Sequence, residues 1–327
     1  MTLAVGLDGG GTKTAAAVVD EAGRVVGSAR AGASSFKSVG LERAAAVLVG
    51  ALRDALGGRT ADAVLAAVSD VDTPGDRDAL RRAVGRALGV AGIEVARLDV
   101  SNDSIAALAS GTGGLARGIA GIAGTGSVAL GLDGRGGEAR AGGWGPPFGD
   151  GGSAYYLGFQ AIGRALKRHD AGQRGTPLLR ELLAASGCRT LPELLFGHVG
   201  AGEEAANAAV YRERVAALAP AIERAALAGD PDAQLVFADA GRELAELVRL
   251  VAGRLGLGGE PCDVVLVGSV WDTAAPQLRE RFAAELTALP GARFVRPTVE
   301  PAVGAARLAI ELVRTGQPCP GGLIQES

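Results

Sequence analysis

Two glycine-rich turns have residue types that suit phosphate binding. Gly9–Thr12 and Gly124–Ser127 each follow a short apolar run, precede another, and carry a hydroxyl residue beside the glycines. Such a turn offers free backbone N–H groups and a hydroxyl, and glycine lets the backbone approach an anion without a Cβ clash. One such turn is equally well explained as a hairpin in a chain with 52 glycines. A matched pair of such turns, facing each other across a cleft, predicts that the turns bind the two ends of a triphosphate.

Two other phosphate-binding motifs fit these turns poorly. The segment 6–12 lacks the lysine that the P-loop spacing places before its hydroxyl residue, and an alternating, strand-like pattern follows it. The segment 124–129 lacks the last glycine of the dinucleotide-binding pattern.

Two aspartates are candidates for chemistry at a bound phosphate. Asp8 ends the first apolar run, and a carboxylate there can hold Mg²⁺, which usually binds one or two carboxylates together with phosphate oxygens. Its simpler interpretation is a turn-forming aspartate. Asp103 follows a predicted strand and precedes an alanine-rich helix. It is therefore either part of the helix N-cap or a general base that accepts the proton of an attacking hydroxyl.

A third stretch, residues 142–153, combines glycines and prolines with Trp144 and Asp150. A tryptophan in such surroundings is poor core material. The stretch suits a rigid loop that presents backbone groups, an aromatic edge and a carboxylate to a ligand. The alternative is a structural anchor.

The elements that position these residues alternate between strands and helices. The first part of the chain predicts strands at 3–7, 15–19, 24–29, 63–68 and 94–98, and helices at 41–56, 77–88 and from about 103. This order predicts a mixed sheet flanked by helices.

A second copy of the opening begins at residue 118. Apolar runs at 3–7 and 15–19 flank the first glycine turn, and apolar runs at 118–122 and 128–132 flank the second. A pattern repeated in this way indicates duplicated domains. Helices at 153–167, 210–228 and 233–255, a strand at 263–267, the Gly268-Ser269 turn and a helix at 302–314 follow. We expect domains at 1–116 and 117–327, with the last helix packing back on the first domain.

Composition excludes several classes of protein. The 327 residues carry a net charge of −3 with no dense Lys/Arg block, which predicts no nucleic-acid partner. No apolar run is long enough for a membrane span, and the first residues do not fit a signal peptide. Three scattered cysteines and two histidines predict a reduced, cytoplasmic protein without a His-rich metal site. We expect a homodimer with small-molecule partners.

Six segments resemble, in their order, those of the N-acetylglucosamine kinases. They read GLDGGGTKT, SNDSIAAL, AGTGSVALG, AGGWGPPFGDGGSAYYLG, VVLVGSVW and PTVEPAVGAA. The ordered set is specific and spans almost the whole chain. These kinases belong with the BadF/BadG-type ATPases in the superfamily of sugar kinases, actin and heat-shock chaperones. The resemblance implies an α/β fold of two ribonuclease-H-like (actin-like ATPase) domains with a central cleft.

The same resemblance implies an activity and a set of site residues. The chain would be an ATP-dependent sugar kinase acting on the 6-hydroxyl of an amino sugar, with ATP and Mg²⁺ as cofactors. Asp103 would be the catalytic base and would also contact the substrate. The ATP-binding residues would be Gly10, Gly11, Thr12, Lys13, Gly124, Thr125, Gly126, Gly268 and Ser269. The other substrate-binding residues would be Ser35, Ser127, Gly143, Trp144, Gly145 and Asp150.

The chain departs from the family pattern at the sugar site. Ser35 stands where the family has an asparagine that contacts the sugar, and Gly151 stands where it has a glutamate. The run 68–70 (Val-Ser-Asp) also replaces a Gly/Ala-rich one. Because Ser35 and Gly151 are small, we predict a sugar pocket with fewer contacts and more room. The substrate is then N-acetylglucosamine, glucosamine or another hexosamine.

Two other functions are alternatives to a kinase. A dehydratase activator of the BadF/BadG type holds an iron–sulfur cluster through cysteines near its phosphate loops, whereas Cys188, Cys262 and Cys319 lie away from these loops in the sequence. A sugar-responsive repressor on this fold would need an N-terminal helix-turn-helix, whereas the first residues here predict a strand.

Overall fold

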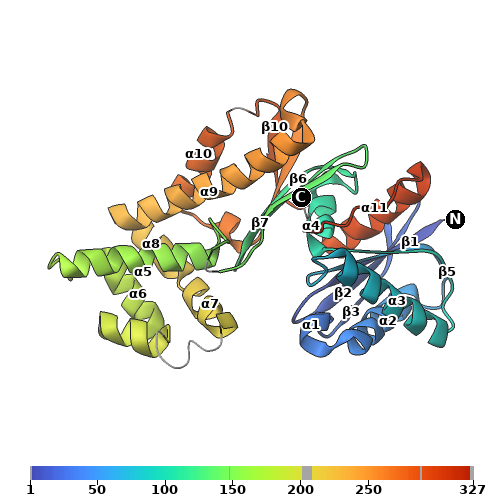
Figure 1. Ribbon diagram of the computed structural model, residues 1–327, viewed down its shortest axis with the longest axis horizontal. Coiled ribbons are helices and arrows are strands. Elements are labelled where there is room, and N and C mark those ends of the chain that lie inside the picture. The colour runs from blue at the N-terminus through green and yellow to red at the C-terminus, as the bar shows by residue number, and fades with distance from the viewer. Residues whose placement is uncertain (1, 147, 201–207, 288, 325–327) are drawn as a thin grey trace.

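The computed structural model describes residues 2–146, 148–200, 208–287 and 289–324, which form two lobes, each built on a five-stranded mixed sheet (Figure 1). The first sheet has the strand order β3-β2-β1-β4-β5 and the second has the order β10-β9-β6-β7-β8. The first comprises β1 (Leu3–Gly9), β2 (Thr14–Asp20), β3 (Val25–Ala31), β4 (Ala61–Val68) and β5 (Val95–Ser101). The second comprises β6 (Arg117–Ala123), β7 (Ser127–Asp133), β8 (Glu138–Gly142), β9 (Cys262–Val267) and β10 (Ala292–Val295).

The two sheets repeat one topology. In each, the first strand lies in the middle, the next two extend the sheet on one side as antiparallel neighbours, and the last two extend it on the other side as parallel neighbours. The turns from β1 to β2 and from β6 to β7 therefore occupy equivalent places, and they are the two glycine-rich turns. The predicted repeat of the strand–turn–strand opening is confirmed.

Helices connect the strands and cover the sheets (Figure 1). The first lobe contains α1 (Phe36–Val39), α2 (Leu41–Leu56), α3 (Pro74–Val90), α4 (Asp103–Thr112) and α11 (Pro301–Thr315). The second contains α5 (Ala154–Asp170), α6 (Pro177–Ser186), α7 (Ala208–Ala216), α8 (Ala219–Leu227), α9 (Pro231–Leu255) and α10 (Pro276–Glu285), with the short segments η1 (Glu193–His198), η3 (Leu257–Gly259) and η4 (Ser269–Asp272). None of the helices in the described ranges is long and apolar enough to cross a membrane.

Helix α4 lies between the sheets and helps to place the functional residues. Its buried Ile105 and Leu108 belong to one apolar cluster with residues of α11 and of both sheets. Helix α11 approaches β1 so closely that a Cβ at Gly6 would lie 2.1 Å from the Ala302 carbonyl oxygen. Only glycine permits that approach. The C-terminal helix is therefore part of the support of β1, the strand that carries Asp8.

One predicted helix is two helices. The pattern at 210–228 indicates a single element, but α7 ends at Ala216 and α8 begins at Ala219. Pro220 explains the break, because proline has no backbone N–H and suits the first turn of a helix better than its interior. No predicted element covers α1, α6, α10, β8 or β10.

The Pro/Gly-rich tail after α11 joins the two lobes. The Gly321 carbonyl accepts from the N–H of Asn102 at 2.8 Å, and the Gly321 N–H donates to Oε2 of Glu138 in β8 at 2.8 Å. The N–H of Ile324 donates to the Asp72 carbonyl at 2.8 Å. The tail therefore packs beside the residue that precedes Asp103.

Candidate active site

The polar residues of the first lobe gather at one edge of its sheet. Strands β1, β4 and β5 are parallel neighbours, so their carboxyl ends meet at the edge where open α/β sheets bind ligands. Asp8 lies at the end of β1, and Asp103 begins α4 just after β5. Asp70 follows the end of β4, and β4 lies between β1 and β5 in the sheet.

The second glycine turn separates two cavities. Thr125 lines one of about 390 Å³, which we call the apolar cavity. Gly126 and Ser127 line another of about 370 Å³, which we call the carboxylate cavity because Asp8 and Asp103 also line it. Both volumes suit small-molecule sites. The start of α5 holds this turn, since the N–H of Ala154 donates to the Gly124 carbonyl at 2.8 Å.

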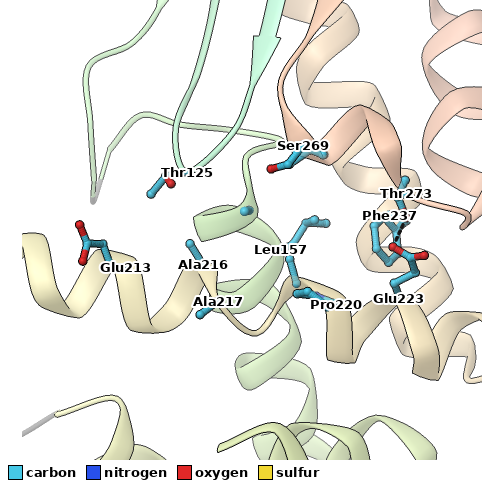
Figure 2. Close-up of a pocket in the computed structure, with 13 residues that line it drawn as sticks. Thr125, Leu157, Glu213, Ala216, Ala217, Pro220, Glu223, Phe237, Ser269 and Thr273 are labelled. Atoms are coloured by element: carbon cyan, nitrogen blue, oxygen red, sulfur yellow. Dashed lines mark hydrogen bonds between the residues drawn. The ribbon is translucent and has the colours of Figure 1, made fainter. Parts of the chain in front are cut away.

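The apolar cavity has a largely apolar lining, with Glu213 at one end and Glu223 at the other (Figure 2). Figure 2 shows Thr125 and Ser269 on one side and Ala216, Ala217 and Pro220 on the opposite side. At one end the Thr273 hydroxyl donates to the Glu223 carboxylate at 2.9 Å. An apolar slot with a few fixed polar groups suits a flat heterocycle such as a nucleobase.

Gly268 brings the Ser269 segment against the second glycine turn. Its φ is +106°, and a Cβ there would lie 2.4 Å from the Ala123 carbonyl oxygen and 3.1 Å from the Gly124 nitrogen. A side chain would be strained by the backbone angle and would clash. Glycine at this position therefore allows Ser269 and Thr125 to line the same cavity.

The carboxylate cavity brings together most of the predicted catalytic and sugar-binding residues. Its lining includes Asp8, Asp103, Ser127, Gly143, Gly145 and Asp150. They come from β1, α4, β7 and the loop before α5, and so from both lobes. Arg212 of α7, which the sequence analysis did not single out, lines the cavity as well.

Asp103 does not cap α4. The N-cap is Asn102, whose side-chain oxygen accepts from the backbone N–H of Ser104 at 3.0 Å. The Asp103 carboxyl lines the cavity instead, and burial, followed by the negative charges of Asp8 and Asp72, raises its pKa from 3.8 to about 6. A carboxylate with such a pKa is charged at neutral pH and still suits proton transfer.

Asp8 is a partly buried carboxylate in the same cavity. Burial raises its pKa, while the positive charge of Lys13 lowers it. In the part of the chain that the structure describes, no group of three or more His, Cys, Asp or Glu residues could hold a metal by itself. That Asp8 holds Mg²⁺ stays a prediction, and such sites usually combine one or two carboxylates with substrate phosphates.

Both carboxylate oxygens of Asp150 accept hydrogen bonds. Oδ1 accepts from the Ser127 N–H at 3.1 Å, and Oδ2 accepts from Arg212 Nη2 at 2.8 Å. Within the described residues it is the one non-glycine residue with a positive φ, +65°. Backbone of this kind persists where the surroundings hold it and is frequent at functional sites. Ser127 adds a further tie, since its hydroxyl donates to the Gly151 carbonyl at 2.7 Å.

Ser35 is buried and does not line either cavity. Its hydroxyl donates to Oδ2 of Asp70, and the backbone N–H of Lys37 donates to the same oxygen at 3.0 Å. Ser35 and Asp70 are both departures from the family pattern. The structure therefore joins two substitutions that lie 35 residues apart.

The expected room at Gly151 is already occupied. A Cβ at this position would lie 2.9 Å from Oε2 and 3.2 Å from the Cβ of Glu243, a residue of α9. Burial raises the pKa of Glu243. The Glu243 carboxylate therefore lies where a side chain at position 151 would point.

Some predicted residues lie outside both cavities. Gly11, Thr12 and Lys13 are exposed at the tip of the β1–β2 turn, where the Gly10 N–H donates to the Lys13 carbonyl at 3.0 Å. The Trp144 side chain is 69% exposed and lines neither cavity. The structure therefore does not bring these side chains into contact with the rest of the site.

Sequence reasoning missed Arg212 and Glu223. Both lie in the helical region between α6 and α9, where no glycine cluster or strand end marks a site. Among the residues that the structure describes, neither has a local partner: Arg212 pairs with Asp150 and Glu223 with Thr273, 62 and 50 residues away. An amphipathic pattern cannot reveal such distant pairs.

Known proteins resemble this chain over nearly its full length. An N-acetyl-D-glucosamine kinase of Dictyostelium discoideum is 28% identical over 326 residues, 94% of this chain and 97% of that protein. An N-acetylmuramic acid/N-acetylglucosamine kinase of Clostridium acetobutylicum is 29% identical, covering 83% of this chain and 86% of that protein. A Chromobacterium violaceum structure, described as a candidate N-acetylglucosamine kinase, matches with a TM-score of 0.66 and 25% identity, covering 94% and 99% of the two chains. This match confirms the predicted two-domain α/β fold. Residues 5–309 carry the sequence pattern of the BadF/BadG/BcrA/BcrD ATPase family, and the chain belongs to that family.

Proposed function

We propose that this chain is an ATP-dependent kinase that phosphorylates the 6-hydroxyl of an amino sugar, with N-acetylglucosamine as the leading substrate. The observation that supports this most is the position of the second glycine turn. Thr125 lines the apolar cavity, and Ser127 lines the carboxylate cavity beside Asp103. A nucleotide with its base in the apolar cavity would therefore point its phosphates toward a basic carboxylate. The names of the two curated relatives support the same activity.

The nucleotide would lie in the second lobe. In this proposal the base occupies the slot between Ser269 and Pro220, and the phosphates follow the turn 124–126. The equivalent turn of the first lobe, with Thr12 and Lys13 exposed, would meet the phosphates from the other side when the lobes approach each other. Backbone N–H groups of such turns favour anions.

Asp103 would act as the general base. As the sugar 6-oxygen bonds to the γ-phosphorus, the bond from that phosphorus to the β,γ-bridging oxygen breaks, and the hydroxyl proton passes to Asp103. The products are a sugar 6-phosphate and ADP. Mg²⁺ held by Asp8 and the phosphates would neutralise charge on the phosphate oxygens.

The sugar would bind between Asp103 and the loop with Gly143, Gly145 and Asp150. Carboxylates that accept from sugar hydroxyls discriminate strongly against analogues that lack one. Asp70, joined to Ser35, lies at the same sheet edge outside both cavities and would act on the sugar through its charge. The choice among amino sugars would then depend on this pair.

An ATPase activator with an iron–sulfur cluster has less support. Such clusters need cysteine thiolates near the phosphate loops. Cys262 is buried in β9 and Cys319 is buried in the tail, while Cys188 follows α6. None of the three lines either cavity.

Asp103→Asn tests this assignment. The variant keeps the shape of the side chain and leaves the Asn102 cap intact, but it cannot accept the proton. Sugar phosphorylation should fall by roughly 10²–10⁴-fold, as for the loss of a general base. Calorimetry should show nucleotide binding within about twofold of wild type. Near-full turnover would show that Asp103 is not the base.

A further inference from the structure

Arg212 lies directly against the second glycine turn. A Cβ at Gly126 would lie 2.1 Å from Arg212 Nη2, so the guanidinium fills the space over this turn. Among the described residues that line the carboxylate cavity, Arg212 carries the one positive charge, whereas Asp8, Asp103 and Asp150 are acidic. The cation therefore stands where the turn meets a cavity lined by carboxylates.

The guanidinium of Arg212 has a donor to spare. Arginine has five N–H donors. Nη2 donates to Asp150 at 2.8 Å, but Nε is buried and has no hydrogen-bond partner in the described ranges. A buried donor without a partner is costly, so a shift of the side chain that gives this donor an acceptor, such as a ligand oxygen, is favourable.

The surroundings favour a phosphate as that ligand. A neutral sugar needs no cation, and Asp103 offers its hydroxyl groups an acceptor. A terminal phosphate of ATP, in contrast, would bring further negative charge into a cavity with three carboxylates. Arginine matches phosphate oxygens with its planar fork of donors, and phosphoryl transfer depends on neutralising these oxygens.

We propose that Arg212 binds the γ-phosphoryl group of ATP and neutralises the charge on its oxygens during transfer. This inference rests on the proposed kinase function. Asp150 positions the guanidinium over the turn through its ion pair. Because Asp150 lines the same cavity as Asp103, this ion pair links the sugar side of the site to the phosphate.

The test compares two nucleotides that differ in the γ-phosphate. The affinities of Mg·ADP and of the Mg complex of the β,γ-imido analogue of ATP are measured by calorimetry for wild type, Arg212→Met and Arg212→Lys. Arg212→Met should weaken the analogue at least about tenfold more than ADP and lower kcat by roughly 10²–10³-fold. Arg212→Lys keeps the charge without the fork and should fall between these values.

Arg214→Met is the matched control. Arg214 lies on the same helix, but its guanidinium donates to the His198 carbonyl at 3.2 Å. This variant should leave the ratio of the two nucleotide affinities unchanged.

Two results would overturn the inference. If Arg212→Met weakens both nucleotides equally, the guanidinium does not contact the γ-phosphate. If it raises the sugar KM while kcat stays unchanged, Arg212 only positions Asp150. Failure of the kinase proposal is distinguishable, because the wild type itself would then bind neither nucleotide or phosphorylate no sugar.

Discussion

The Ser35 hydroxyl donates a hydrogen bond to the Asp70 carboxylate, so the two departures from the family pattern in the first lobe act as a pair. Asp70 follows β4, between the strands that lead to Asp8 and Asp103. The smaller side chain at position 35 therefore accommodates a carboxylate at this edge of the sheet. Its negative charge would narrow the preference for N-acetylglucosamine over glucosamine, because it attracts the ammonium group of glucosamine.

The double variant Ser35→Asn with Asp70→Ala should move the preference toward N-acetylglucosamine and away from glucosamine. It restores a neutral amide and removes the carboxylate, and each change should be worth about 1 kcal/mol. The measurement is the ratio of kcat/KM for the two sugars in wild type and variant. Asp76→Ala is the control, because Asp76 caps α3 away from both cavities. If the ratio does not move, this pair does not select the substrate.

Arg140→Met should shift the acid limb of the pH profile to higher pH. The positive charge of Arg140 lowers the pKa of Asp103, while burial and the charges of Asp8 and Asp72 raise it to about 6. Removing the cation also frees Asp72 from its 3.2 Å ion pair with Arg140. The base therefore becomes protonated at a higher pH. The check is kcat/KM for the sugar against pH, and an unmoved limb would mean that another group controls it.

Asp103→Asn should stabilise the fold at neutral pH. Because the pKa of Asp103 is raised from 3.8 to about 6, the native state binds a proton more readily than the unfolded state between these values. Wild-type stability therefore falls as the pH rises through this window, by up to about 3 kcal/mol. Urea unfolding should show a more stable variant at about pH 7.5 and a much smaller difference at about pH 4. An equal difference at both would contradict the raised pKa.

The sequence predicted the parts of the site that rest on local signals. The glycine turns, the strand ends at Asp8 and Asp103 and the repeated hairpin could be recognised because period-two apolar runs and glycine clusters are short-range patterns. The ion pair of Arg212 with Asp150 and the contact of Glu243 with Gly151 could not, because each joins segments separated by a whole helix or more. Pro220 carried a local signal, but the apolar pattern around it concealed the break between α7 and α8.

Gly268→Ala should weaken nucleotide binding by displacing the Ser269 segment. The new Cβ would lie 2.4 Å from the Ala123 carbonyl oxygen, at a φ of +106°, so the Ser269 segment must move away from the glycine turn. We expect nucleotide affinity to fall by tenfold or more, about 1.4 kcal/mol, together with a lower Tm. Gly253→Ala in α9 is the control, because a Cβ there meets no atom within 4 Å and alanine favours the helix. Equal nucleotide affinities in the two variants would show that Gly268 does not shape the nucleotide site.

The most direct test of the account is whether the purified wild-type protein transfers phosphate from ATP to an amino sugar. The protein is incubated with Mg·ATP and, separately, N-acetylglucosamine, glucosamine, N-acetylmannosamine or glucose. ADP is quantified, and the sugar product is identified by ³¹P and ¹³C NMR. An amino sugar should be phosphorylated on its 6-oxygen, with one ADP formed for each sugar phosphate. ADP release without any phosphorylated sugar, or no turnover with any of these sugars, would contradict it.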